Sequence, residues 1–228
     1  TTYAFTDLHA VEETKHAILD FSAGKDVGLG LFGAHSSSTL NVGLRIVQFT
    51  NRADARMTAQ MSVAHKYDFS SGANAKILDA SLHKKSSFTG IGPMLDWNGA
   101  VPIVGDLDNG LEFDWGANAA LLVGRQKASV DTQNKKSGYA GVTSAGYALI
   151  PTSITHATNH TVRRRTAIVP NIGAFAAISY RLEGRGKVSF GYRTDFFIHA
   201  MDGGIASRRD EDIGFQGPFA TISMGLGG

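Results

Sequence analysis

Hydrophobic and polar residues alternate along much of the chain, most regularly over residues 111–125, LEFDWGANAALLVGR. Successive side chains of an extended strand point to opposite faces of a sheet. One face of this stretch is therefore apolar, and the other carries small, polar or acidic residues, including Glu112 and Asp114. The alternation is longer than the about 5–6 residues of an ordinary soluble strand, and it suits the about 9–11 residues that cross a bilayer at a tilt.

Six further stretches show the same alternation: 17–24, 40–49, 88–97, 167–182, 188–200 and 213–226. Residues 1–16 predict no firm structure, and the polar stretches 51–84 and 128–160 predict long surface loops. Short turns on one side and long loops on the other are typical of outer-membrane barrels. The pattern predicts an all-β fold over 1–228: a single antiparallel transmembrane β-barrel of about eight strands, with short periplasmic turns and long extracellular loops.

Composition argues against transmembrane helices, cysteine-based sites and a nucleic-acid partner. No apolar run reaches the about 18 residues of a transmembrane helix, whereas a barrel remains compatible with a mean hydropathy of −0.08, because half of each strand faces the lumen. The chain has no cysteine, which excludes disulfides and thiolate metal sites. A net charge of +2 is too small to indicate a nucleic-acid partner.

Charges of both signs fall on the face opposite the apolar one and define the predicted lumen-facing set: Asp20, Arg45, Asp96, Glu112, Asp114, Arg181, Arg193, Asp195 and His199. In a narrow barrel these side chains would pair and fill the interior. In a wider barrel they would form charged walls that select solutes. The predicted lipid-facing set is Leu44, Trp115, Leu121, Ile178, Phe190, Phe196 and Ile222.

Two motifs could indicate nucleotide binding or metal-dependent catalysis, but each has a simpler interpretation. GLGLFG at 28–33 matches the dinucleotide fingerprint, but no helix pattern or βαβ rhythm follows, so a glycine-rich turn is favoured. His156 and His160 have metalloprotease spacing, but alanine follows the first histidine where the motif requires glutamate. We therefore predict no enzyme activity, no cofactor and no metal site.

Three blocks carry a resemblance to a known family: residues 85–97 (KSSFTGIGPMLDW), 111–127 (LEFDWGANAALLVGRQK) and 213–219 (IGFQGPF). Together they resemble the Legionella-type major outer-membrane protein family of porin-like barrels. Members of that family are longer at the N-terminus, so the chain looks like the C-terminal part of such a barrel or a shortened relative. The resemblance implies an outer-membrane barrel with a porin or structural function, and it supplies no catalytic residues.

The sequence thus predicts a protein of the bacterial outer membrane, acting as a porin-like passive channel or a structural surface protein of a Gram-negative bacterium. The alternative is a soluble β-barrel or sandwich that binds a hydrophobic ligand, with the alternation turned inside out. Predicted partners are outer-membrane lipid and lipopolysaccharide, whose phosphates Arg163–Arg165 would meet at a strand end. A homo-oligomer or other envelope proteins are further predicted partners, and no nucleic acid is expected.

Overall fold

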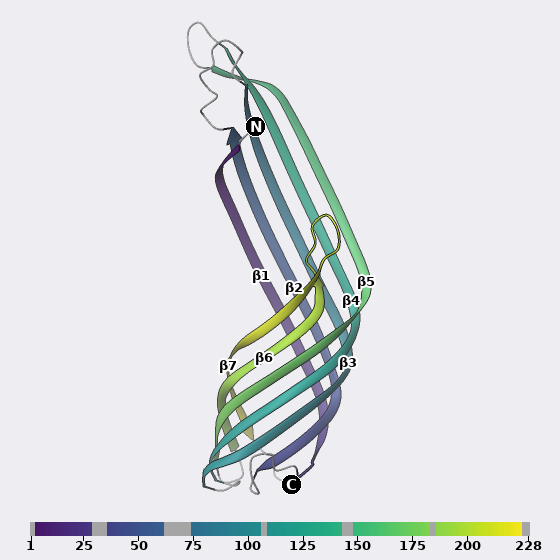
Figure 1. Cartoon of the computed structure of the whole chain (residues 1–228), viewed down its shortest axis with the longest axis vertical. Coiled ribbons are helices and arrows are strands. Elements are labelled where there is room, and N and C mark those ends of the chain that lie inside the picture. The colour runs from purple at the N-terminus through teal and green to yellow at the C-terminus, as the bar shows by residue number, and fades with distance from the viewer. Residues whose placement is uncertain are drawn as a thin grey trace. The chain divides into compact units, whose positions relative to one another are not determined.

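The computed structural model describes residues 3–28, 36–61, 74–105, 109–142, 148–182 and 186–224. They form one seven-stranded sheet in which neighbouring strands follow chain order (Figure 1). The strands are β1 (Tyr3–Asp26), β2 (Ser37–Met61), β3 (Asn74–Gly105), β4 (Gly110–Val142), β5 (Ala148–Leu182), β6 (Gly186–Asp202) and β7 (Asp210–Met224). The prediction of an all-β antiparallel sheet is confirmed. The described residues contain no helix able to cross a membrane.

The order of hydrogen-bonded neighbours is linear, from β1 to β7. In the described residues the sheet is therefore not closed into a barrel. β5 pairs with β6 in an unbroken antiparallel register from Asn171 opposite Phe197 to Leu182 opposite Gly186. β6 pairs with β7 in the same way, except for a register shift between Phe197 and Met201.

Two compact units divide the chain, and the five longer strands contribute to both. Unit 1 comprises Thr1–Lys15, Thr50–Ser87 and Lys127–Arg164; unit 2 comprises His16–Phe49, Phe88–Gln126 and Arg165–Gly228. Each of β1 to β5 therefore has one segment in unit 1 and one in unit 2, whereas β6 and β7 lie wholly in unit 2.

The loop predictions were wrong. The described parts of 51–84 and 128–160 are strand, because β2 continues to Met61, β3 begins at Asn74, β4 continues to Val142 and β5 begins at Ala148. Residues 62–73 and 143–147 lie outside the described residues. The segment 1–16, for which no structure was predicted, is part of β1 from Tyr3 onward. The backbone hydrogen bonds of a sheet do not require an apolar face, so a strand that is polar on both faces shows no alternation.

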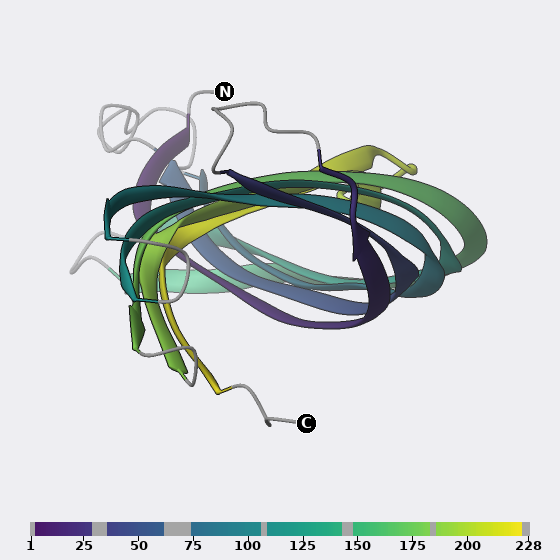
Figure 2. The ribbon, with the colours of Figure 1, turned by 90° about the horizontal axis from the view of Figure 1, so that it is seen from below.

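Unit 2 has two distinct faces. Every second side chain is buried on one face, which we call the inner face; Glu112 and Leu122 on β4 are examples. The intervening side chains lie on the opposite, outer face, where Leu121 and Val123 of β4 are about half exposed. Figure 2, a view from below, shows that the strands of unit 2 form a curved sheet. At the β3–β4 connection Gly105 and Gly110 have φ of 92° and 155°, a backbone region open to glycine.

Candidate functional site

The inner face of unit 2 begins, near the β5–β6 connection, with a charged layer. Lys187 Nζ of β6 lies 2.5 Å from Glu112 Oε1 and 2.6 Å from Asp114 Oδ2. Arg181 Nη2 of β5 lies 3.2 Å from Glu112 Oε1, and Ser179 Oγ donates a 2.5 Å hydrogen bond to Asp114 Oδ2. Two carboxylates thus face two cations, so the layer is electrically balanced and its buried charges are paired.

Arg45 forms the second layer and connects five strands. Its Nε and Nη2 each donate a 2.8 Å hydrogen bond to Asp20 of β1. Its Nη1 donates to Asn118 Oδ1 of β4 at 2.8 Å and to Asn171 Oδ1 of β5, and it lies 3.6 Å from Asp195 Oδ1 of β6. The Arg45 side chain is only 1% exposed. A bidentate guanidinium–carboxylate pair of this kind fixes both distance and orientation, so Arg45 holds the inner face together at this level.

Further polar pairs lie beside Arg45. Arg193 Nε donates a 2.6 Å hydrogen bond to Asp195 Oδ2, the carboxylate that also faces Arg45. Asn98 and Asn41 donate to Asp96 Oδ2 at 2.6 and 3.3 Å. These contacts join residues of β2, β3 and β6 to the same polar level, so that most of its charged groups have a partner.

An apolar layer follows the Arg45 level along the strands. Phe49, Phe88 and Phe197 are each 0% exposed, and Phe49 lies edge-on to Phe197 with ring centroids 4.6 Å apart. Phe215 of β7 adds a ring 5.5 Å from Phe49. The rest of this cluster is Val47, Met94, Ala120, Leu122, Ala167, Val169, Ala200, Met201 and Ile213. Side chains packed in this way leave little room for water.

A polar rim ends the inner face of unit 2 beyond the apolar layer. Gln126 Nε2 donates a 2.6 Å hydrogen bond to the carbonyl of His199, and Arg165 donates from Nε to Gln126 and from Nη2 to Asp210 Oδ1 at 2.7 Å. Arg208 Nη2 donates to Asp210 Oδ2 at 2.6 Å. The hydrogen bonds from Arg208 are the main reason that the pKa of Asp210 lies below its ordinary value.

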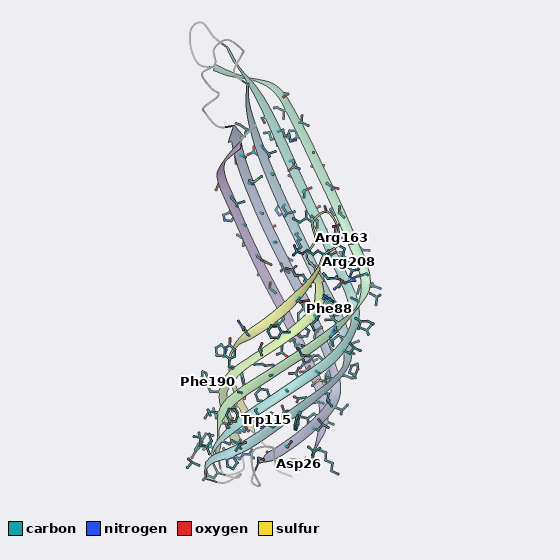
Figure 3. All side chains as sticks on the ribbon, in the orientation of Figure 1. Asp26, Phe88, Trp115, Arg163, Phe190 and Arg208 are labelled. Carbon is teal, nitrogen blue, oxygen red and sulfur yellow. The ribbon has the colours of Figure 1, made fainter. Side chains whose placement is uncertain are left out.

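The outer face of unit 2 is a belt of exposed apolar side chains. Leu44, Leu121, Ile178, Phe190, Phe196 and Ile222 of the predicted lipid-facing set are 46–77% exposed, and Phe190 projects from β6 away from the ribbon (Figure 3). Trp115, the remaining member, is half-buried against Trp97, with ring centroids 5.1 Å apart. On β4 the apolar series from Leu111 to Val123 covers about 40 Å of strand, or about 30 Å at a tilt of about 40°. That height matches the hydrocarbon core of a bilayer, about 30 Å.

The chain is similar to a known outer-membrane protein family along nearly its whole length. The family model of the Legionella pneumophila major outer membrane protein precursor matches residues 2–225. The chain belongs to this family. No curated protein matches the chain. This member of the Legionella major outer membrane protein family is a protein of the bacterial outer membrane, and the resemblance read from the three sequence blocks is confirmed.

In this outer-membrane protein the side chain of every residue of the predicted inner set except His199 takes part in the polar contacts described above. His199 lies within the register shift of β6, with φ of 55°, and its side chain is exposed. A bulge of this kind turns a side chain away from its expected face. Lys187 was missed because the strand was predicted to begin at Val188, one residue too late for the alternation to include it.

Unit 1 carries most of the remaining candidate residues. An open groove of about 600 Å³ is lined by polar side chains, including His9, Arg56 and His156. His160 pairs with Asp131 across β5 and β4, and among the described residues no group of histidines and carboxylates could hold a metal ion. The glycine-rich motif at 28–33 lies mostly outside the described residues. Arg163–Arg165 lies within β5 and not at a strand end, which corrects that prediction.

Proposed function

We propose that this outer-membrane protein is a closed β-barrel with a sealed interior, acting as a structural surface protein and not as an open porin-like channel. The observation that supports this proposal is Arg45, whose side chain reaches from β2 to partners on β1, β4, β5 and β6. A guanidinium bonded to several strands at once occupies the space that a wide pore would leave to water. The interior of small barrels is filled by side chains in this way.

The apolar layer supports the same function. Ions cross a membrane protein through a polar, hydrated path, and an apolar constriction stops them by excluding water. The packed rings of Phe49, Phe88 and Phe197 would form such a constriction beside the Arg45 level. The paired carboxylates and cations of the inner face then stabilise the barrel and do not select solutes.

Closure of the sheet is the second part of the proposal. Backbone groups in hydrocarbon must be hydrogen-bonded, so β1 and β7 cannot both be open edges in the bilayer. Seven antiparallel strands leave β1 and β7 running in the same direction. An eighth strand between them, antiparallel to both, would give the even number usual for bacterial barrels. Side chains of the two edges already approach each other, since the ring centroids of His16 and Phe215 are 4.0 Å apart.

The outer-membrane assignment leaves the alternative of a soluble ligand-binding barrel without support. We further propose that the protein works without catalysis or a cofactor, because its buried carboxylates Glu112, Asp114 and Asp195 are each held by cations or hydrogen bonds within the inner face. Asp195 lines an open cavity of about 590 Å³, but its two carboxylate oxygens face Arg193 and Arg45, so it is not free to act as a nucleophile or base.

Conductance in planar bilayers tests the sealed interior. The purified protein should show no steady open-channel current, whereas a double variant that removes two rings of the apolar layer, Phe49→Ala with Phe197→Ala, should leak ions. Phe190→Ala is the matched control, because that ring is exposed on the outer face. A stable unitary current from the unmodified protein would show that the interior is an open pore. Faster migration of the unheated protein on a gel would report closure.

A further inference from the structure

A row of cations crosses the outer face of unit 1 where the unit begins. Four consecutive strands each contribute one: Arg52 from β2, Lys85 from β3, Lys127 from β4 and Arg164 from β5. All four side chains are exposed. Each continues, by alternation along its strand, the outer-face series of unit 2. We call these four residues the cationic row.

Cross-strand contacts give the register within the row. On β2 and β3, Asp54 contacts His83 and Thr58 donates a 3.0 Å hydrogen bond to Asp79, which agree on one antiparallel register. Two residues along each strand from the Asp54–His83 contact, Arg52 lies opposite Lys85. Like charges placed directly opposite each other in a sheet are destabilising.

The same arrangement repeats on the next pair of strands. His160 of β5 contacts Asp131 of β4. Four residues along each antiparallel strand from that contact, Arg164 lies opposite Lys127. Since β2, β3, β4 and β5 are consecutive neighbours in the sheet, two like-charged pairs lie on adjacent strands. Each pair combines one arginine with one lysine.

The described residues leave the charge of the cationic row without an acidic partner. In the part of the chain that the structure describes, no carboxylate forms an ion pair with any member of the cationic row. The nearest acids at the following outer-face positions, Asp54 and Asp131, instead pair with His83 and His160. A concentration of exposed positive charge at fixed positions costs free energy unless an anion from outside the chain binds to it.

Position along the strands identifies the anion. On the side of unit 2, the outer-face series on each of these strands continues into the apolar belt, with Ile46, Ile91, Val123 and Ile168. If that belt is embedded in lipid, as the proposed function requires, the row lies where the hydrocarbon ends and the head groups begin. Basic side chains at this depth bind phosphorylated lipid head groups.

We propose that the cationic row is a binding site for the phosphate groups of outer-membrane lipids. An arginine offers a planar fork that binds two phosphate oxygens, and a lysine offers a compact point charge. Each opposed pair supplies one of each, so a phosphate held between the two strands would relieve their repulsion. The inference rests on the proposed function only in placing the belt within the bilayer.

The test uses the protein refolded into phosphatidylcholine vesicles with and without phosphatidic acid, whose head group is a phosphomonoester. A fourfold variant, Arg52→Gln, Lys85→Gln, Lys127→Gln and Arg164→Gln, is compared with the control Arg56→Gln with Lys135→Gln, which removes two cations farther from the belt. Phosphatidic acid retained per protein, measured by native mass spectrometry, should fall at least about tenfold in the fourfold variant and little in the control.

Thermal unfolding provides a second, independent test of phosphate binding by the cationic row. In neutral detergent the fourfold variant should unfold at a higher temperature than the unmodified protein, because the like-charge repulsion is gone. In phosphatidic acid vesicles the order should reverse. Equal retention of phosphatidic acid by both proteins, or complete displacement by millimolar inorganic phosphate, would overturn the assignment to lipid. Insertion without a preference for phosphatidic acid would contradict this inference alone, whereas a chain that inserts but conducts ions would contradict the sealed interior.

Discussion

The same five strands have different chemistry in the two units. In unit 2 the outer face is apolar and exposed and the inner face is packed with paired charges and phenylalanine rings. In unit 1 both faces are mainly polar, and its large exposed apolar side chains are only Leu8, Val11, Ile154 and Val162 among the described residues. Strand formation is therefore common to both units, whereas a lipid-compatible surface belongs to unit 2.

The two units also differ in how their charged side chains are stabilised, by buried partners in unit 2 and by solvent in unit 1. The charges of unit 2 meet one another inside the sheet, as Arg45 meets Asp20 and Lys187 meets Glu112. The charges of unit 1 are solvated on the surface, where the pairs His83–Asp54 and His160–Asp131 are about half exposed or more. Buried pairs are costly to break from one side, and exposed pairs contribute little.

The largest expected effect comes from the centre of unit 2. Arg45→Met should reduce the free energy of unfolding by about 3–5 kcal/mol, because Asp20 and Asp195 would lose their shared cation. Equilibrium unfolding in urea from detergent or vesicles would measure it. Adding Asp20→Asn and Asp195→Asn to Arg45→Met should recover part of the loss. A cost below about 1 kcal/mol for Arg45→Met would mean that the inner network does not hold unit 2 together.

A charge placed on the outer face of one strand should cost more stability in unit 2 than in unit 1. Ile178→Arg on β5 puts a cation in the apolar belt of unit 2 and should cost about 2–4 kcal/mol if it lies near the bilayer midplane. Val162→Arg, at the same face of β5 but in unit 1, should cost about 0–1 kcal/mol. Folding into vesicles from urea measures both. Equal costs for the two variants would remove the distinction between the units.

The smallest effect concerns the rim of unit 2. Because the pKa of Asp210 is lowered by its hydrogen bonds from Arg208, the stability that this pair contributes is present above the ordinary aspartate pKa and is lost as the pH falls through the lowered value. Asp210 is exposed, so solvent screening keeps the contribution small. Asp210→Asn should lower the thermal midpoint slightly at pH 7 and not at pH 2. A large loss at both values would mean that Asp210 acts through packing.

Sequence reasoning found unit 2 and missed unit 1 for one physical reason. Alternation appears only where one face of a sheet is apolar, so β4 could be read from Leu111 to Val123 but not onward through residues 128–142. The polar strands of unit 1 therefore resembled loops. The alternation alone placed Arg45 and Glu112 on the inner face, where the structure buries them, and the three sequence blocks identified the outer-membrane family.

Partners within the inner face could not be predicted in the same way. Arg45 and Asn171 are far apart in the sequence, and only the pairing and curvature of the strands bring them together. Lys187 is the second residue of β6, and the predicted strand began at Val188, two residues after β6 itself begins. The bulge that exposes His199 reflects an extra residue in β6, which a regular alternation does not show.

Depth profiling along β5 would measure where on this strand the lipid-facing surface of unit 2 begins. The chain has no cysteine, so single cysteines at the even positions from 154 to 182 can each carry a nitroxide label without removing native thiols. Electron paramagnetic resonance in vesicles then compares relaxation by oxygen, which dissolves in lipid, with relaxation by a water-soluble nickel complex. We expect nickel access up to Arg164 and oxygen access from Ile168 onward. A profile that does not change between these residues would contradict this expectation.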